Sequence, residues 1–106
     1  MKKLILSVAV VLAIGPAAAL AASPDGAAVY AEICGRCHST GEYGSPKLGD
    51  AGAWTPRFHE GVDHLVEQAI NGLGAMPPRG GVEGLSDADL RAAIVYMLGQ
   101  AGLKAE

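Results

Sequence analysis

Cys34-Gly35-Arg36-Cys37-His38 is the stretch of this 106-residue sequence that decides its fold. Two thiols three residues apart on one turn can add to the two vinyl groups of a single porphyrin, and a histidine directly after the second thiol is then held beneath the iron. The spacing therefore predicts one haem c, covalently attached at Cys34 and Cys37. His38, through its Nε2 atom, is the expected proximal ligand of the iron.

Three other uses of a cysteine pair are alternatives. A redox dithiol, half of a zinc site and a structural disulfide can each employ two cysteines at this spacing. A zinc site needs two further ligands, and the other histidines, His59 and His64, show no clustered pair. A thioredoxin-like dithiol is expected in a βαβ context, which this sequence lacks. Haem attachment fits the motif better than each of these.

The N-terminal segment has the features of a secretory signal peptide. A basic start, Lys2 and Lys3, precedes an apolar run, and small residues follow with a cleavage site near Ala21. We predict a signal peptide at residues 1–21 and one cytochrome domain at residues 22–106, located in the periplasm. An uncleaved membrane anchor is the alternative, because the apolar segment is almost long enough to span the ~30 Å bilayer core.

Cleavage would leave an acidic domain. Without Lys2 and Lys3, six of the eight basic residues remain against eleven acidic ones, which gives a formal charge of −5. Phosphate binding needs a basic face, so this charge argues against nucleic acid as a partner. The domain is also near the size at which a core alone is marginal, and it has few aromatic residues. A bound cofactor would supply the missing stabilisation.

Helical periodicity predicts three helices in this domain. Asp25 is a candidate N-cap for a helix over residues 26–37. Apolar residues recur at helical spacing over residues 62–70, with polar residues on the other face. Ser86 begins a pattern that resembles a capping box, and the last helix follows it and ends near Leu98. No strand signal is present, so the predicted fold class is all-α.

Two segments rich in glycine and proline, residues 38–57 and 72–81, are expected to be long loops. The first is long for a structureless loop in a small domain, which suggests that it wraps around something. The second contains two prolines without N–H donors and glycines that favour turns, so it cannot be a helix or a central strand. This second loop presents Met76.

The second axial ligand decides between electron transfer and chemistry at an open haem. Met76 stands on a loop where an exposed thioether would have little structural purpose, whereas Met97 lies on the apolar face of the last helix, where a core role is expected. His59 and His64, just before and on the polar face of the middle helix, are rival ligands. We predict Met76 as the distal ligand, facing His38 across a slot that both cysteines line, with the rival histidines pointing away.

Five motifs occur in a fixed order along the chain: Cys34-Gly-Arg-Cys-His38, Lys47-Leu-Gly-Asp50, Trp54-x-Pro56-Arg57, Gly74-Ala-Met-Pro-Pro-Arg-Gly-Gly81 and Leu85-Ser-Asp87. Together they resemble class I cytochrome c, in particular its c5-like branch, from Asp25 to Gly99. The attachment signature is shared by all c-type cytochromes, whereas the Met-Pro-Pro loop at this distance is far more specific. The resemblance implies the class I cytochrome c fold, with about three to four short helices and long loops wrapped around one haem.

The resemblance also implies two particular contacts. Gly26 and Tyr30 on the first helix should cross Ala93 and Tyr96 on the last, because small residues permit a close approach. The carbonyl oxygen of Pro46 should accept a hydrogen bond from Nδ1 of the proximal histidine, which fixes the tautomer and the orientation of the ring.

The sequence also suggests roles for other charged and aromatic residues. Trp54 and Arg57 either lie near the haem propionates or serve as a core aromatic and a surface charge. Some c5-like proteins carry an extra cysteine pair near the distal loop, and its absence here implies that proline, glycine and packing alone hold this loop. Arg36, Lys47 and Arg79 lie close in sequence to haem-contacting residues, which predicts a weakly charged or locally basic rim for docking.

These patterns favour a diffusible one-electron carrier that is not an enzyme. Its cofactor would be one haem c with its iron, and its partners would be redox proteins that dock transiently. No small-molecule substrate, nucleic acid or stable membrane insertion is expected. One alternative is a small haem enzyme or gas-binding haem protein with a displaceable distal ligand. Another is a dithiol oxidoreductase without haem.

Overall fold

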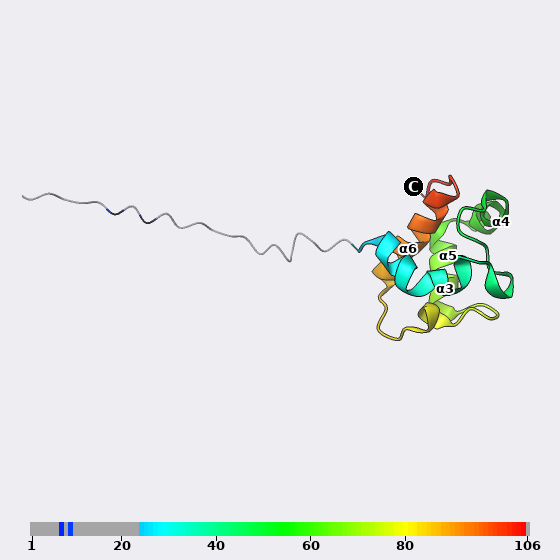
Figure 1. Ribbon diagram of the computed structural model, residues 1–106, viewed down its shortest axis with the longest axis horizontal. Helices are drawn as coiled ribbons and strands as arrows, with labels where there is room; N and C mark the ends of the chain where they lie inside the picture. Colours follow the sequence, from blue (N-terminus) through cyan, green and yellow to red (C-terminus); the bar gives the residue numbers. More distant parts are fainter. Residues whose placement is uncertain (1–6, 8, 10–23, 106) are drawn as a thin grey trace, which may run out of the picture.

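The computed structural model describes residues 7, 9 and 24–105. The predicted signal peptide falls almost entirely outside these residues and stays a prediction. In the described part of the chain the elements are helical, and extended pairing is confined to one isolated bridge between Leu73 and Met76. Four main helical segments, joined by loops and short 3-10 turns, pack into one body, as expected for the all-α class (Figure 1). No described helix has the length and apolar content needed to cross a membrane.

The first helical segment runs without a break from α2 (Gly26–Val29) through the π-helical turn η1 (Tyr30–Cys34) to α3 (Gly35–His38). The Asp25 carboxylate caps it by accepting hydrogen bonds from the backbone amides of Ala27 and Ala28 at 3.1 and 3.2 Å. The predicted helix over residues 26–37 is therefore confirmed. The π-helical turn was not predicted, because apolar spacing does not distinguish it from an α-helix, and such turns often occur at functional sites.

Helices α5 (Val62–Asn71) and α6 (Asp87–Gln100) supply most of the other core side chains. The predicted capping box is confirmed: Ser86 Oγ accepts from the Asp89 amide at 3.0 Å, and the Asp89 carboxylate accepts from the Ser86 amide at 3.4 Å. Met97 is 2% exposed, as expected for a core methionine. The buried side chains of these two helices are Val62, Leu65, Val66, Ala69, Leu90, Ala93, Ile94, Met97 and Leu98.

The first and last helical segments cross in close contact. A Cβ atom added at Gly26 would collide with the carbonyl oxygen of Ala92 and lie 3.1 Å from Cβ of Tyr96. One turn further along, the rings of Tyr30 and Tyr96 pack with centroids 5.5 Å apart and an interplanar angle of 47°. The predicted crossing is confirmed for Gly26, Tyr30 and Tyr96, and Ala92 rather than the expected Ala93 lies against Gly26.

Part of the predicted loop at residues 38–57 is helical, so this prediction was wrong there. Helix α4 (Ala51–Arg57) and the 3-10 turn η2 (Glu42–Gly44) lie within it, and a second 3-10 turn, η3 (Phe58–Glu60), follows it. Helix α4 forms because Trp54 is 3% exposed and its Nε1 donates to the Lys47 carbonyl at 3.0 Å. The Gly and Pro content hid this helix, since its stability comes from tertiary burial of one aromatic ring rather than from propensity.

The close crossing predicts that Gly26→Ala destabilises the protein. The added methyl group would have to displace the Ala92 carbonyl, so we expect the free energy of unfolding to fall by about 1–3 kcal/mol. Chemical denaturation of the haem-loaded protein measures this change. Gly99→Ala in α6 is the matched control, because its Cβ would meet open space, and it should raise stability by about 0.5–1 kcal/mol. Equal effects of the two variants would contradict this account.

Candidate functional site

His38 is a buried histidine whose ring is held at its edge and at its face. Its Nδ1 lies 2.7 Å from the carbonyl oxygen of Pro46, and its ring stacks on Trp54 with centroids 5.7 Å apart. A carbonyl oxygen can only accept a hydrogen bond, so Nδ1 is the donor, and in the neutral ring the lone pair is then on Nε2. The predicted contact with Pro46 is confirmed. The ring therefore presents a nitrogen suited to bind iron.

Cys34 and Cys37 are half-buried and are not joined in a disulfide. Burial raises the pKa of the Cys34 thiol above its usual value. A dithiol oxidoreductase needs the opposite shift, because its attacking cysteine must be a thiolate near neutral pH. The environment of Cys34 therefore argues against the dithiol alternative and leaves both sulfur atoms available for other bonds.

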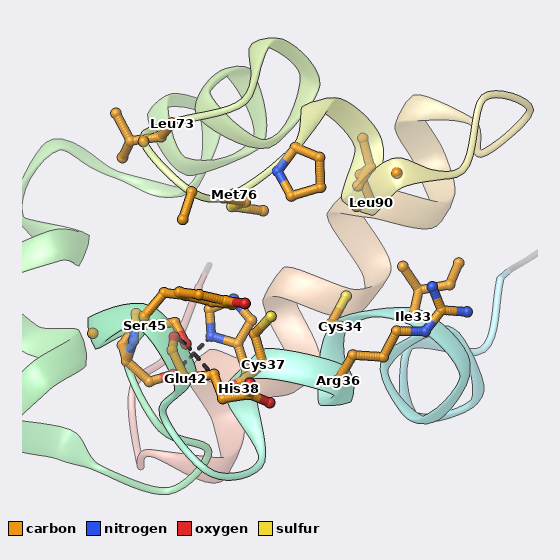
Figure 2. A pocket seen from close by; sticks show the side chains of 18 of the residues that line it. Ile33, Cys34, Arg36, Cys37, His38, Glu42, Ser45, Leu73, Met76 and Leu90 are labelled. Carbon is orange, nitrogen blue, oxygen red and sulfur yellow. Dashed lines mark hydrogen bonds between the residues drawn. The ribbon is translucent and has the colours of Figure 1, made fainter.

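A cavity of about 520 Å³ brings the predicted site residues together. This volume lies within the ~300–1,000 Å³ of small-molecule and cofactor sites. Figure 2 shows Met76 and Leu73 on one wall and His38 and Cys37 on the opposite wall, with Cys34 beside them. The side chains that the sequence placed around one slot thus line one cavity.

A second cavity, of about 260 Å³, continues the same cleft. His38 and Met76 line both cavities, so the cleft extends to both sides of this pair. Trp54 lines the second cavity and Arg57 lines both, and their suggested nearness to the haem propionates stays a prediction. A flat ring placed between His38 and Met76 would have room on either side of the line that joins them.

The two rival histidines lie in different places. His59 is exposed and lines neither cavity. His64 lines the second cavity, so the prediction that it points away from the cleft was wrong. It is on the polar side of α5, but this side borders the cleft because α5 buries Leu65 and Ala69 beside it. Its Nε2 lies 3.6 Å from a carboxylate oxygen of Glu60.

The wall that carries Met76 is fixed by a tight turn. The amide of Leu73 donates to the Met76 carbonyl, and the amide of Met76 donates to the Leu73 carbonyl, both at 2.9 Å. Gly72, with φ of 83°, starts the turn at a point where a Cβ would lie 2.9 Å from Met76 oxygen. The backbone of Met76 is therefore held by paired hydrogen bonds, which a thioether needs if it is to stay at one position.

The expectation that only proline, glycine and packing hold this loop was wrong. Arg79 Nη1 donates to the Leu85 carbonyl at 2.8 Å and lies 2.7 Å from Oδ1 of Asp87. Arg79 is thus neutralised by an acidic partner, does not line either cavity and does not belong to a basic rim. Arg36 does line the first cavity, whereas Lys47 is exposed and lines neither.

Two exposed apolar side chains at the opening of the first cavity were not identified from the sequence. Tyr43 is 81% exposed and Leu73 is 59% exposed. Both line this cavity, Tyr43 from η2 next to Glu42 and Leu73 from the wall of Met76. We call this pair the apolar rim. A single tyrosine or leucine in a loop carries no periodic signal, so only the folded chain reveals the pair.

These residues fit a haem. The cleft offers a lone pair on His38, a thioether on Met76 from the facing wall and two unpaired cysteine sulfurs along one side. The cavity is otherwise lined largely by apolar atoms of residues such as Ile33, Pro77 and Leu90. Histidine and methionine on opposite walls are a ligand set of cytochrome haem iron.

Comparisons with known proteins point in the same direction. Residues 21–97 match the family model described as cytochrome c oxidase, cbb3-type, subunit III. Cytochrome c-555 of Chlorobaculum tepidum is 44% identical over 79 residues, which cover 71% of this chain and 73% of that protein. Cytochrome c5 of Azotobacter vinelandii is 45% identical over 73 residues, which cover 67% of this chain and 88% of that protein.

Solved structures are similar as well. A chain in the crystal structure of the electron transfer complex of nitrite reductase with cytochrome c superposes with a TM-score of 0.68 at 45% identity, covering 72% of this chain and 93% of that chain. The mono-heme ferrocytochrome c from Shewanella putrefaciens gives a TM-score of 0.63 at 44% identity, covering 69% of this chain and 90% of that chain.

The site predicts that Cys34→Ala combined with Cys37→Ala abolishes covalent attachment of haem. Each single variant can form at most one thioether bond and should give much less stable haem protein, because one anchor of the cofactor is lost. Intact mass together with the visible spectrum of the reduced protein measures both the attachment and the yield. Normal amounts of stable haem protein from the double variant would rule out attachment at this motif.

Proposed function

We propose that this chain, which belongs to the class I monohaem cytochromes c, is a periplasmic electron carrier with His38 and Met76 as iron ligands. The c5-like proteins are part of this family. It carries one covalently bound haem c and acts in electron transfer, as its relatives do. The observation that carries the ligand assignment is that His38 and Met76 line both parts of one cleft from facing walls. The periplasmic location is supported by the predicted signal peptide.

The protein side chains have distinct tasks in this function. Haem iron, when bound, supplies one-electron oxidation and reduction. His38 offers Nε2 in a fixed orientation, since its other nitrogen is hydrogen-bonded to Pro46. Met76 offers a thioether, which favours the reduced state of the iron and raises its potential. Apolar residues around the cleft lower the local dielectric and act in the same direction.

The relatives are electron carriers, which is consistent with a chain that is not an enzyme. A haem iron bound by both His38 and Met76 would have no open position for a substrate. A haem enzyme or a gas-binding haem protein would need Met76 to leave the iron readily. The paired hydrogen bonds of the Leu73–Met76 turn oppose such a movement.

Transient docking of a redox protein is the remaining part of the proposal. The similar cytochrome in the nitrite reductase complex supports docking on another protein. The apolar rim at the cavity opening offers a contact surface, because the free energy falls when a partner removes exposed tyrosine and leucine side chains from water. Arg36, Glu42 and Arg57 also line this cavity, so the opening has little net charge although the chain is acidic.

We expect Met76→Ala to open the distal position. The reduced variant should bind carbon monoxide at neutral pH and have a lower reduction potential than the wild type, because an alanine side chain cannot ligate iron. Absorption spectroscopy and a redox titration measure both changes. Met97→Leu is the matched control: this buried methionine also lines the second cavity but is not the proposed ligand, so its replacement should leave the distal position closed to carbon monoxide. Persistent binding of carbon monoxide by the wild type would favour the gas-binding alternative.

Replacing the apolar rim should weaken docking. Tyr43→Ser combined with Leu73→Ser should lower the second-order rate of electron transfer to the nitrite reductase of the related complex by about three- to tenfold. The loss should persist at high salt, because apolar contacts are not screened. Val95→Ser is the control, since Val95 is an exposed apolar residue that lines neither cavity. A loss that vanishes at high salt, or an equal loss with Val95→Ser, would argue against docking on the rim.

A further inference from the structure

The chain bends sharply three residues after Met76. Arg79 has φ of 54° and ψ of 33°, and Gly80 has φ of 63° and ψ of 16°, so both residues are left-handed. This conformation is unfavourable for a residue with a side chain, because its Cβ approaches the following carbonyl oxygen. Arginine has no local advantage at such a position. Its presence therefore calls for an interaction of the side chain that maintains the bend.

The guanidinium group of Arg79 supplies this interaction. Its Nη1 donates to the carbonyl of Leu85 at 2.8 Å and lies 2.7 Å from the carboxylate of Asp87. Leu85 is a buried core residue, and Asp87 is the first residue of α6. The two contacts flank Ser86, the N-cap of α6. A single nitrogen thus ties the loop that follows Met76 to the start of the last helix through charge-assisted bonds.

The other side of the bend packs on the first helical segment. A Cβ added at Gly80 would lie 2.5 Å from Cγ2 of Ile33, so only glycine fits there. Ile33 directly precedes Cys34 in the π-helical turn. The bend is therefore held between the helix that carries the haem-attachment motif and the helix that supports the core. The segment that joins α5 to α6 is yellow to gold in Figure 1.

We infer that Arg79 is a positioning residue for the distal ligand, an inference that rests on the proposed ligation of iron by Met76. The Leu73–Met76 turn fixes one end of the loop, and the guanidinium bridge fixes the other. Without the bridge, the loop samples conformations in which the Met76 sulfur has left the iron, and an external ligand competes more successfully for the vacant position. The bridge restrains the loop, as a disulfide near such a loop would.

Imidazole titration of the ferric haem protein tests this inference. Displacement of the methionine is measured as the loss of the far-red absorption band of methionine-bound ferric haem. Arg79→Ala keeps a Cβ, and hence the backbone cost of the left-handed conformation, and removes only the bridge. We expect the imidazole concentration at half displacement to fall about tenfold, as for the loss of a charge-assisted hydrogen bond. Asp87→Asn should lower it by about threefold, because the contact with Leu85 remains.

Arg91→Ala is the matched control. Arg91 Nη1 lies 2.7 Å from Oδ1 of Asp63, so this variant removes the same charge and an ion pair of the same length, between α6 and α5. For this variant the imidazole concentration at half displacement should stay within about twofold of the wild-type value. A wild-type midpoint for Arg79→Ala, or equal shifts for both arginine variants, overturns the inference while leaving Met76 ligation intact. A wild-type protein without the methionine band overturns the ligand assignment and the inference together.

Discussion

The close contact between Gly26 and the Ala92 carbonyl is the constraint on which the rest of the structure depends. It sets how closely the first helical segment can approach α6. The haem-attachment motif ends this first segment, so the crossing also sets the position of Cys34, Cys37 and His38 relative to the core. A side chain at the crossing would move the first helical segment away from α5 and from the loop that carries Met76.

The two walls of the cleft are held by different kinds of interaction. The wall with His38 belongs to a helix and is locked by a hydrogen bond to Pro46 and by stacking on Trp54. The wall with Met76 is a loop, which relies on a tight turn at one end and on the Arg79 bridge at the other. Loops open more readily than helices in a core. If Met76 binds the iron, as proposed, its loop is therefore the part of the site that would open first.

Charge and apolar surface are divided in a way that suits brief encounters. The whole chain has a formal charge of −3, yet the cavity opening is lined by two arginines against one glutamate. Tyr43 and Leu73 extend into water at this opening. A small apolar contact stabilises the correct orientation of the two docked proteins, but it buries much less area than a lasting complex does. A carrier that must leave its partner after each electron benefits from such a small contact.

The sequence by itself determined the local chemistry of this protein. The spacing of the attachment motif, the Asp25 cap, the capping box at Ser86 and a methionine on a glycine- and proline-rich loop are each encoded within a few residues, so their structural consequences could be predicted. The all-α fold followed from helical periodicity together with the order of the motifs. The wall positions of the predicted ligands agree with that interpretation, and iron ligation itself stays a prediction.

Only the tertiary structure decided which distant groups meet. Helix α4 exists because Trp54 is buried, His64 borders the cleft because of how α5 packs, and Arg79 reaches Leu85 rather than the solvent. Tyr43 lies at the cavity opening through a turn that no periodic pattern marks. Each of these facts depends on the path of the chain between residues that are not neighbours. Hydrogen-bonding capacity and hydrophobic periodicity are local properties of a sequence, whereas burial and long-range pairing are fixed only when the chain closes on itself.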